Sequence, residues 1–363
     1  MTKITMLAPA NVNHTHKWAH NLAGRGYQIH LITQHPAAES YNESIKITQL
    51  PFRGTKGYFL NAAKVKALLS AEDPGIVHAH YASGYGTLAA LSVKQPYLLS
   101  VWGSDVYLFP YRSWLHRQWI DFSLKRASHI ASTSHAMADQ VISLIGPRDI
   151  DVTPFGVNIE SFHTRRPAFS NDTITIGTAK KLEWRYGVDV LIQSFKLLLE
   201  QVDQQTFNRL RLRLIGEGSK RNELQQLASQ LGVGKKVEFV GAVSSTEVVN
   251  ELEKIDIVVL SSRVESFGVS AIEALAARRP TIAADVGGLP EIIKHEQTGL
   301  LCAPDKPAQF AGAILRYISD NHFAKNLAEQ GYKFASETYS EAATTDTMCE
   351  TLELFRKNKC NNL

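Results

Sequence analysis

Short apolar runs alternate with amphipathic helical patterns along almost the whole chain, and this alternation limits the folds that are open to it. In the first half we expect strands at residues 4–8, 28–33, 45–50, 76–78, 97–101, 129–132 and 151–153. In the second half the expected strands cover 173–177, 210–215, 237–240, 257–260 and 281–283, with helical patterns between them. Because strands separated by helices pair in parallel with helices on both faces, the sequence predicts an α/β protein with doubly wound, Rossmann-like sheets.

The same alternation occurs twice, which suggests two domains. We expect an N-terminal domain at residues 1–165 and a C-terminal domain at 166–344, because 363 residues are too many for one ordinary domain. Residues 162–172 have the charge and turn composition of a linker. After Pro307 the pattern is purely helical, with helices expected at 310–319, 323–336 and 340–357.

The composition is that of a soluble globular protein, with 44% hydrophobic and 20% charged residues. The cysteines form no CxxC pair and have no histidine in metal-ligand spacing, so we expect neither a disulfide framework nor a zinc site. The N-terminus lacks a basic start followed by a long apolar run, and the longest uncharged stretch, 74–93, contains two histidines. We therefore expect a cytoplasmic protein in a reducing compartment.

The net charge of +4 is unevenly distributed. Residues 1–165 hold 15 Lys and Arg against 10 Asp and Glu, which leaves 24 against 25 in the rest of the chain. A basic first half suggests an anionic partner, although chance surface composition explains a difference of this size equally well. We expect no nucleic acid partner.

Two glutamates eight positions apart lie in the segment with the clearest functional signal, residues 261–301. Glu265 precedes a glycine turn, and Glu273 lies within the alanine-rich helix expected over 269–277. Free backbone N–H groups and the positive dipole end at the start of such a helix suit a diphosphate. The carboxylates can accept hydrogen bonds from sugar hydroxyls. An isolated pair of this kind is usually two solvated carboxylates, so the surrounding motif decides.

That motif is a small-residue helix followed by a GG-x-P-E-I turn. The order ESFG, EAL, GGLPEII and TGLL resembles the retaining glycosyltransferases of family 4, the glycosyl transferases group 1. The resemblance implies GT-B architecture, in which two Rossmann-like domains face each other across a cleft. It further implies an N-terminal acceptor domain, a C-terminal nucleotide-sugar domain, and a last helix at 345–363 that packs back on the N-terminal domain.

The resemblance assigns the glutamates and their neighbours to the donor. Glu265 is expected to hold donor-sugar hydroxyls as a catalytic residue, and Glu273 to hold the ribose. The turn residues expected beside the donor are Ser266, Phe267, Gly268 and Val269. The residues that resemble the family's G-x-G loop, and its strand-to-loop element at the nucleobase, are Gly216 and Gly218, and Val240 and Gly241.

A strand-to-helix junction at residues 177–187 supplies three cations and resembles the family's G-R-L-x-x-x-K-G element. Lysine replaces the family's arginine, with Lys180 and Lys181 both eligible, and Arg185 replaces its lysine. Lys180 keeps the usual separation, so we expect Lys180 and Arg185 as catalytic cations and Lys181 as a donor-binding residue. Fixed cations can neutralise a leaving diphosphate. No DxD-type carboxylate pair stands out, and we expect neither a metal nor a cofactor.

The N-terminal half departs from the family pattern. Where the family has a Gly-Gly turn after the first strand, this chain has His14 at the start of a helix. Trp102 occupies the place of the family's H-G-x-D histidine, and indole, which only donates, cannot perform the proton chemistry of imidazole. We expect a catalytic sugar contact from Asp105, or from a backbone carbonyl near Trp102, and acceptor contacts from His14, His80 and Trp102. Alternatively, Trp102 and Asp105 merely end a strand. His78 shares a strand face with His80, where buried histidines are expected rather than metal ligands.

Residues 109–119 interleave aromatic and basic side chains. Such side chains suit a membrane interface or a lipid-phosphate acceptor, and they equally suit packing under a loop. With the basic excess of the first half, this stretch suggests a lipid-linked or anionic glycan acceptor, approached by peripheral contact with the inner membrane face.

The resemblance to this family implies a metal-independent, anomer-retaining hexosyltransferase. It would pass a hexose-type sugar from a nucleotide sugar to a glycan or lipid-linked acceptor, in surface polysaccharide or glycolipid assembly, by a front-face mechanism. The alternative is a nucleotide-sugar epimerase of the same two-domain shape, which would need no acceptor. A dehydrogenase is disfavoured because no G-x-G-x-x-G follows a strand. A non-catalytic sugar-binding relative is disfavoured by the retained glutamates and cations.

Overall fold

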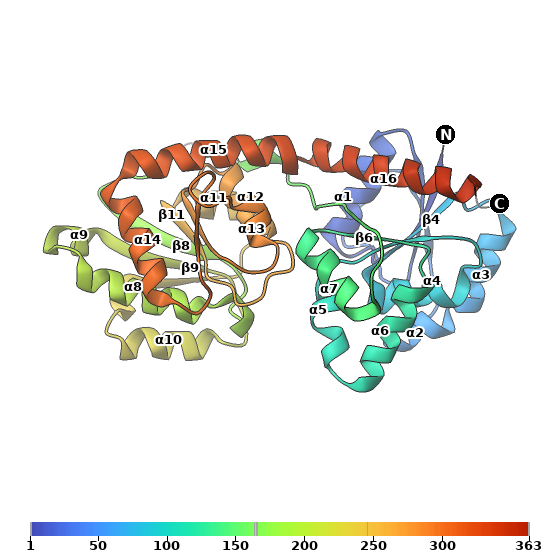
Figure 1. Ribbon diagram of the computed structural model, residues 1–363, viewed down its shortest axis with the longest axis horizontal. Coiled ribbons are helices and arrows are strands. Elements are labelled where there is room, and N and C mark those ends of the chain that lie inside the picture. The colour runs from blue at the N-terminus through green and yellow to red at the C-terminus, as the bar shows by residue number, and fades with distance from the viewer. Residues whose placement is uncertain (1, 163, 165, 245, 362–363) are drawn as a thin grey trace. The chain divides into compact units, whose positions relative to one another are not determined.

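The computed structural model describes residues 2–162, 164, 166–244 and 246–361, and within these it divides into two compact units (Figure 1). Unit 1 is Met1–Gly156 together with Glu341–Leu363, and unit 2 is Val157–Ser340. Each unit is a parallel sheet covered by helices on both faces. The predicted fold class, α/β with two doubly wound Rossmann-like sheets, is confirmed.

Among the described residues of unit 1, seven strands form one sheet in the order β3-β2-β1-β4-β5-β6-β7. The strands are β1 Lys3–Leu7, β2 Gln28–Thr33, β3 Lys46–Gln49, β4 Ile76–His80, β5 Leu98–Ser100, β6 His129–Ser132 and β7 Ile150–Val152. All neighbours pair in parallel, and β1 pairs with both β2 and β4. The strand order therefore reverses between β1 and β4, and this reversal is the switch point at which doubly wound folds bind ligands.

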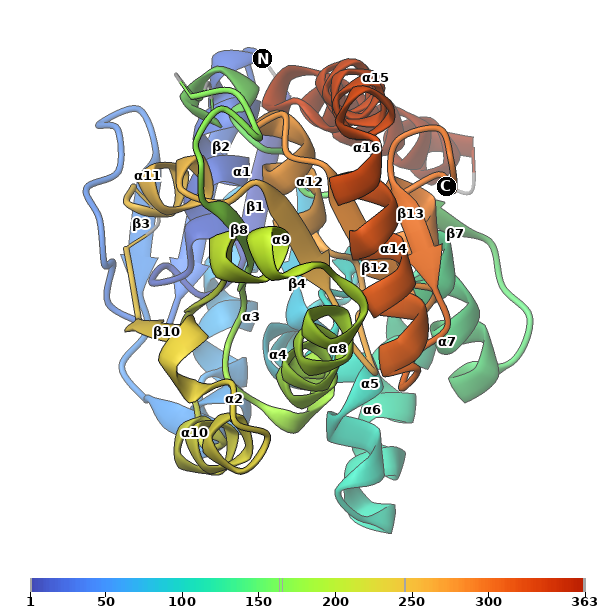
Figure 2. The ribbon, with the colours of Figure 1, turned by 90° about the vertical axis from the view of Figure 1, so that its left-hand side faces the viewer.

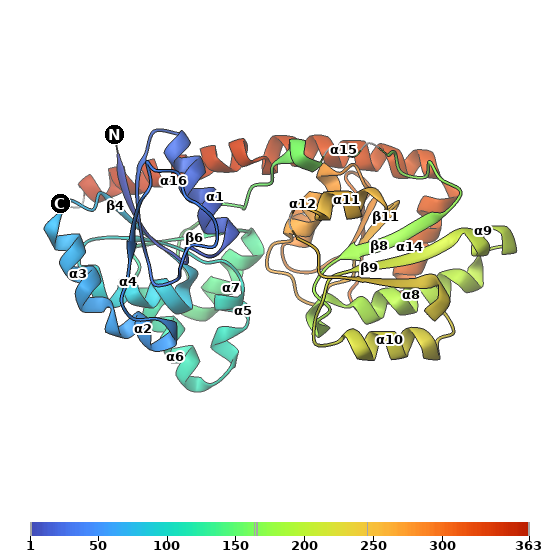
Figure 3. The ribbon, with the colours of Figure 1, turned by 180° about the vertical axis from the view of Figure 1, so that it is seen from behind.

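The helices of unit 1 cover both faces of this sheet. They are α1 Asn13–Gly24, α2 Gly54–Leu60, α3 Ala62–Ala71, α4 Thr87–Ser92, α5 Ser104–Tyr107, α6 Trp114–Arg126, α7 His135–Ile145 and α16 Glu341–Asn361, with the π-helix η1 Tyr81–Gly86 and the 3₁₀-helix η2 Phe109–Tyr111. On one face α1 packs against α16, and on the other α4 packs against α6 (Figures 1 and 3). Ser113 and Ser134 start α6 and α7 by accepting hydrogen bonds from backbone N–H groups.

Unit 2 repeats the design with six strands in its described part, in the order β10-β9-β8-β11-β12-β13. The strands are β8 Ile174–Ala179, β9 Leu210–Ile215, β10 Val237–Gly241, β11 Ile257–Leu260, β12 Thr281–Ala284 and β13 Leu300–Cys302. Again all neighbours are parallel, and β8 pairs with both β9 and β11. The switch point of unit 2 lies between β8 and β11.

Helices cover both faces of the second sheet, as they do in unit 1. They are α8 Val188–Gln201, α9 Gln204–Arg209, α10 Arg221–Gln230, α11 Val248–Glu253, α12 Val269–Ala276, α13 Leu289–Ile292, α14 Pro307–Ser319 and α15 Asn321–Tyr339, with the 3₁₀-helices η3 Ile159–Phe162, η4 Trp184–Tyr186 and η5 Gly234–Lys236. On one face α8 packs against α10 and α14 (Figure 2), and on the other α12 packs against α15.

The predicted linker at residues 162–172 is part of unit 2. Arg166 makes an ion pair with Asp256 at 2.7 Å, and the same carboxylate accepts the backbone N–H of Phe169 at 2.8 Å. Phe162 is buried, while residues 163 and 165 lie outside the described residues. These contacts explain why unit 2 begins at Val157, ahead of the expected boundary at 165.

Candidate functional site

The candidate site of unit 2 lies at the carboxyl ends of β8 and β11, on either side of the switch point. Lys180 directly follows β8, and Glu265 follows β11 after a short loop. Because neighbouring parallel strands end at the same sheet edge, these side chains from distant parts of the sequence meet there. The sheet topology therefore creates the site.

Lys180 and Glu265 form an ion pair at this edge, with 2.5 Å between Nζ and Oε2. Their side chains are only 10% and 11% exposed. Ser262 donates to the same carboxylate oxygen at 3.3 Å. Lys181, by contrast, is exposed. Of the two lysines that were eligible from the sequence, the one preferred for its spacing, Lys180, is the one paired with Glu265.

Arg185 joins this pair through an aromatic ring. The Lys180 ammonium and the Arg185 guanidinium lie 4.9 Å and 4.7 Å from the centre of the Tyr186 ring. Cations are attracted to the face of such a ring, so Tyr186 holds two positive groups near each other without neutralising either. In the sequence Tyr186 was only an extra residue before a glycine.

Two glycines allow the loops of this edge to come close together. A Cβ atom on Gly216, whose φ is +135°, would overlap the carbonyl oxygen of Lys180, and one on Gly287, whose φ is +53°, would overlap that of Glu265. Both positive φ values also disfavour any other residue. Because Gly216 and Gly287 have no side chains, their loops can pack directly against the backbone of Lys180 and of Glu265.

The other predicted donor residues lie around the same edge. Gly268, with φ of +118°, is the N-cap of α12, and Glu273 lies partly buried within that helix. Ser266 and Val269 are partly buried beside it, and Phe267 is buried. Gly218 follows β9, Val240 and Gly241 end β10, and Gly241 accepts the backbone N–H of Gly216 at 2.8 Å.

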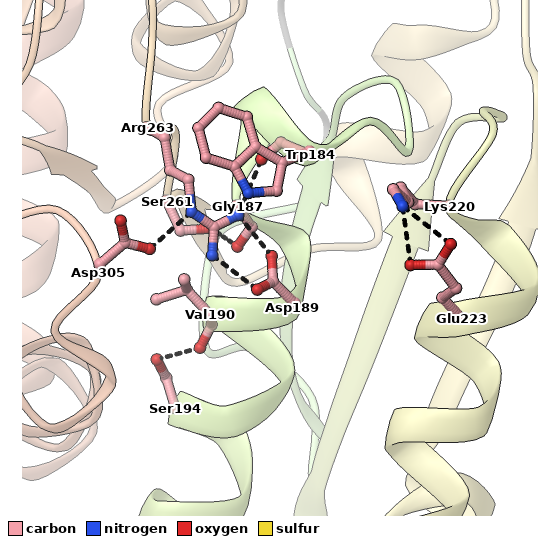
Figure 4. A network of polar contacts seen from close by, with 10 residues as sticks. All are labelled: Trp184, Gly187, Asp189, Val190, Ser194, Lys220, Glu223, Ser261, Arg263 and Asp305. Carbon is pink, nitrogen blue, oxygen red and sulfur yellow. Dashed lines mark hydrogen bonds and ion pairs between the residues drawn. The ribbon is translucent and has the colours of Figure 1, made fainter.

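Arg263 is a residue of this edge that the sequence analysis missed (Figure 4). Its guanidinium makes a bidentate ion pair with Asp189, at 2.9 Å and 2.6 Å, and bonds to Asp305 at 2.7 Å. It also donates to the backbone oxygen of Trp184 at 2.8 Å, and its own backbone N–H donates to Arg185 at 2.8 Å. The fork of an arginine suits such bidentate binding. Arg263 therefore ties the loop that carries Glu265 to the one that carries Arg185.

A pocket of about 310 Å³ lies beside this network, between α8 and α10. Its lining residues are Glu183, Trp184, Val188, Asp189, Lys220, Glu223, Leu224, Leu227 and Gln230. Lys220 pairs with Glu223 at 2.8 Å, and Glu183 accepts the N–H and O–H of Ser219. The charged side chains that line the pocket, Glu183, Asp189, Lys220 and Glu223, thus all have partners.

In unit 1, rings gather at the switch point between β1 and β4. His14 stacks on Phe155, with ring centroids 3.7 Å apart, and its ring lies 5.9 Å from that of Trp102. His80 lies 5.3 Å from Trp102 and 3.9 Å from His78. The structure thus brings together the three residues expected to bind the acceptor, His14, His80 and Trp102.

The imidazoles of this cluster are neutral. Burial lowers the pKa of His14 to about 4, with help from Lys17, and lowers that of His78 to about 3. Burial also lowers the pKa of His80 well below its usual value, with a smaller effect from His78. His78 accepts or donates one hydrogen bond with Ser100 at 2.8 Å, whereas both ring nitrogens of His80 are buried without a partner among the described residues.

The contacts of Asp105 differ from those expected of a catalytic residue. Its carboxylate is fully buried and accepts the backbone N–H groups of Ala82 at 2.8 Å, Gly103 at 2.8 Å and Trp102 at 3.1 Å. Burial raises its pKa, and these hydrogen bonds act in the opposite direction. Asp105 is better described as the residue that fixes the Trp102 turn than as one that touches a sugar.

Within the described ranges, no group of three or more His, Cys, Asp or Glu side chains is arranged to hold a metal ion. In the same part of the chain, no helix is long and apolar enough to cross a membrane.

Comparison with known proteins gives matches over nearly the whole chain. The family model of glycosyl transferase 4-like proteins matches residues 3–134, and that of glycosyl transferases group 1 matches residues 160–334. An uncharacterized glycosyltransferase of Methanocaldococcus jannaschii is 28% identical over 318 residues, which is 85% of each chain.

Solved structures match as well. Sucrose-phosphate synthase from Thermosynechococcus elongatus has a TM-score of 0.82 at 18% identity and covers 98% of this chain and 99% of its own. Anabaena HepE in complex with UDP-glucose has a TM-score of 0.77 at 18% identity, with 98% and 100% covered. At this identity the structural matches show the shared fold.

Proposed function

Because the chain belongs to the glycosyltransferases of group 1 and has the predicted GT-B fold, we propose that it transfers a hexose-type sugar from a nucleotide sugar to a glycan or lipid-linked saccharide. The anomeric configuration would be retained, and the product would belong to a surface polysaccharide or glycolipid. The observation that carries this proposal is the nearly buried Lys180–Glu265 ion pair at the switch point of unit 2.

The ion pair suggests how a donor would be held. A diphosphate carries more negative charge than one carboxylate, so it would draw the Lys180 ammonium away from Glu265 and attract the Arg185 guanidinium that lies over the same Tyr186 ring. Glu265 would then be free to accept hydrogen bonds from hydroxyls of the donor sugar, while Glu273 holds the ribose. Donor binding would thus exchange one set of charged contacts for another.

The same cations would serve the chemical step. In the proposed front-face mechanism the bond between sugar and phosphate breaks, and the leaving oxygen takes the proton of the acceptor hydroxyl as the new glycosidic bond forms. Lys180 and Arg185 would stabilise the charge that develops on the leaving diphosphate, a contribution that is large when the groups are already in place. No metal is needed in this scheme.

The first test is a thermal-shift panel of UDP, GDP and ADP with their sugars. A ligand that binds only the folded state raises stability by about 2.7 kcal/mol at 100 times its Kd. UDP-glucose is the first ligand to try, because the structurally similar HepE was solved with it. If no nucleotide sugar in the panel shifts the melting temperature, the proposal fails.

The second test follows the reaction with the donor so identified. Transfer should continue in EDTA, and NMR of the product should show the anomeric configuration of the donor. Loss of activity in EDTA with recovery in manganese would reject the metal-free scheme, and an inverted product would reject retention. An arm without acceptor tests the epimerase alternative, which the family matches do not favour.

Substitutions then separate the two glutamates. Glu265→Ala should abolish transfer and leave binding of the nucleoside diphosphate largely intact, whereas Glu273→Ala should weaken that binding by about 1–3 kcal/mol. Glu329→Ala, which breaks an exposed ion pair with Arg278, is the control and should change neither quantity. Unchanged calorimetric affinity in Glu273→Ala would reject the ribose assignment.

A further inference from the structure

Unit 1 exposes large apolar side chains on three neighbouring elements. They come from α2 with the turn before it, from η2, and from the outer side of α6, and they are Phe52, Phe59, Leu60, Leu108, Tyr111, Trp114, Leu115 and Phe122. We call this set the aromatic face. Tyr111, Trp114 and Leu115 are 64%, 71% and 68% exposed, which is unusually high for such side chains.

Ring contacts join these elements into one surface. The Trp119 ring lies 5.1 Å from that of Phe59 and 5.2 Å from that of Phe109. Trp119 is fixed beneath the surface, because its indole N–H donates to Thr87 at 2.5 Å. Helices α2 and α6 both pack against α4. The aromatic face is therefore continuous from α2 to α6.

Helix α6 has apolar residues on two opposite sides. Ile120 and Leu124 are buried in the core of unit 1. Leu115 and Phe122, seven positions apart and therefore on one side of the helix, are exposed. Packing in the core explains why Ile120 and Leu124 are apolar, but it does not explain the apolar residues on the exposed side of α6. Single exposed apolar residues are common, but a continuous exposed set indicates an interaction surface.

Positive charge surrounds the aromatic face. Basic residues exposed on the same elements, or directly beside them, are Arg53, Lys56, Arg112, Lys125 and Arg126. The acidic residue of α6, Asp121, is already paired with Arg117 at 3.0 Å. Two copies of such a surface would repel each other, whereas an anionic surface would be attracted.

We propose that the aromatic face binds the surface of an anionic lipid bilayer. Tryptophan and tyrosine side chains combine an apolar body with a polar end and favour the headgroup level of a membrane. Leu115 and Phe122 reach the acyl boundary, and the basic residues contact lipid phosphates. This inference rests on unit 1 alone and holds whichever donor sugar the enzyme uses.

The structure also selects the residues for the test. Arg117 lies in the aromatic-basic stretch, but it pairs with Asp121 and donates to the backbone oxygen of Leu144 at 2.5 Å. Its substitution would damage the packing of α6 and α7. Arg112 and Lys125 are exposed and suit a charge reversal, and Trp114 and Leu115 suit a polar replacement.

The experiment is co-sedimentation with vesicles of phosphatidylglycerol and phosphatidylcholine in equal parts, and with phosphatidylcholine alone. Wild type should pellet with the anionic vesicles at low salt and be released as salt rises. Trp114→Ser/Leu115→Ser and Arg112→Glu/Lys125→Glu should each bind about tenfold or more weakly. Leu354→Ser and Lys235→Glu are controls from exposed sites elsewhere and should pellet as wild type does.

Unchanged melting temperatures of all variants establish that folding is intact. Equal pelleting of wild type and both face variants would overturn the proposal. So would equal binding to neutral and anionic vesicles, because the basic residues would then have no role. Light scattering that shows a dimer, lost in Trp114→Ser/Leu115→Ser, would assign the face to a second copy of the chain instead.

Discussion

The two units have sheets of the same topology, yet they fill their switch points with opposite kinds of side chain. In unit 2 the ends of β8 and β11 bring together a lysine and a glutamate, 2.5 Å apart. In unit 1 the ends of β1, β4 and β5 bring together His14, His80 and Trp102, and both imidazoles are neutral. One edge is built from full charges, and the other from rings without charge.

This difference matches the two halves of the proposed reaction. A leaving diphosphate is anionic throughout and needs fixed positive charge, whereas an acceptor hydroxyl is neutral and needs shape and hydrogen bonds. The two sheets share the reversal of strand order at the switch point, which shows that topology gives only the place of a site. Its chemistry comes from the few residues that follow the strands.

Removing a charge from the unit 2 edge should have the largest effect. Lys180→Met should lower kcat/KM by about 10²–10³-fold, since a preorganised cation at the leaving group is lost. Lys181→Met is the matched control, and with its exposed side chain it should cost less than about threefold. Steady-state kinetics with the identified donor measures both. Equal losses would mean that the buried ion pair does not mark the important lysine.

The second prediction concerns the close backbone approach in unit 2. Gly287→Ala should lower the free energy of unfolding by about 3 kcal/mol or more and reduce turnover, because the new Cβ would displace the backbone of Glu265. Gly232→Ala has a positive φ of +70° but open space around it, and should cost only about 1–2 kcal/mol. Urea unfolding measures both. Similar values for the two would show that strain in φ, and not the contact with Glu265, sets the effect.

Arg263 tests whether the charges of unit 2 need positioning. Arg263→Met should lower the free energy of unfolding by about 1–3 kcal/mol, because Asp189 and Asp305 lose a shared partner. It should also lower kcat. Arg316→Met breaks an ion pair with Glu296 whose two side chains are about half exposed, and should cost less than about 1 kcal/mol. If kcat is unchanged in Arg263→Met, the arginine serves stability alone.

Acid should affect unit 1 before unit 2. His78 and His80 have lowered pKa values in the folded state, so below pH 6.5 the unfolded chain binds more protons. Stability is then complete above pH 6.5 and falls by about 1.4 kcal/mol per pH unit for His78 as the pH drops toward 3, and His80 adds a loss in the same direction. Hydrogen exchange at pH 7 and pH 5 should show the greater loss of protection in unit 1. His80→Phe should flatten this dependence, and equal losses in both units would contradict it.

Much of the fold follows from the sequence because buried parallel strands are short apolar runs. Gln28–Thr33, Leu210–Ile215 and Ile257–Leu260 have the expected bounds. The short edge strand β13, Leu300–Cys302, was missed because it lies within the motif TGLL, where no periodicity develops. The linker at 162–172 was misassigned because its polar residues looked solvated, whereas Arg166 and Phe169 bind Asp256 from far along the chain.

The candidate site, like the fold, could be predicted from the sequence only in part. Lys180, Arg185 and Glu265 were expected because they lie in spaced motifs. Arg263 was not, although it lies within the same segment, because its partners Asp189 and Asp305 are 74 and 42 positions away. Asp105 was predicted from its place in a motif, but only the fold reveals that backbone N–H groups occupy its carboxylate. Spacing along a chain identifies a residue's neighbours in sequence, not its neighbours in space.

The glycines of the unit 2 edge have a consequence for how this chain can change over evolution. At Gly216 and Gly287 any side chain would collide with the backbone of Lys180 or Glu265, so these positions can accept almost no mutation. Val240 and Ser266 around the same edge are partly exposed and are not glycines in a left-handed conformation, so they tolerate other side chains more readily. Drift toward a new donor sugar should therefore accumulate at the latter positions, while the loop framework is inherited unchanged.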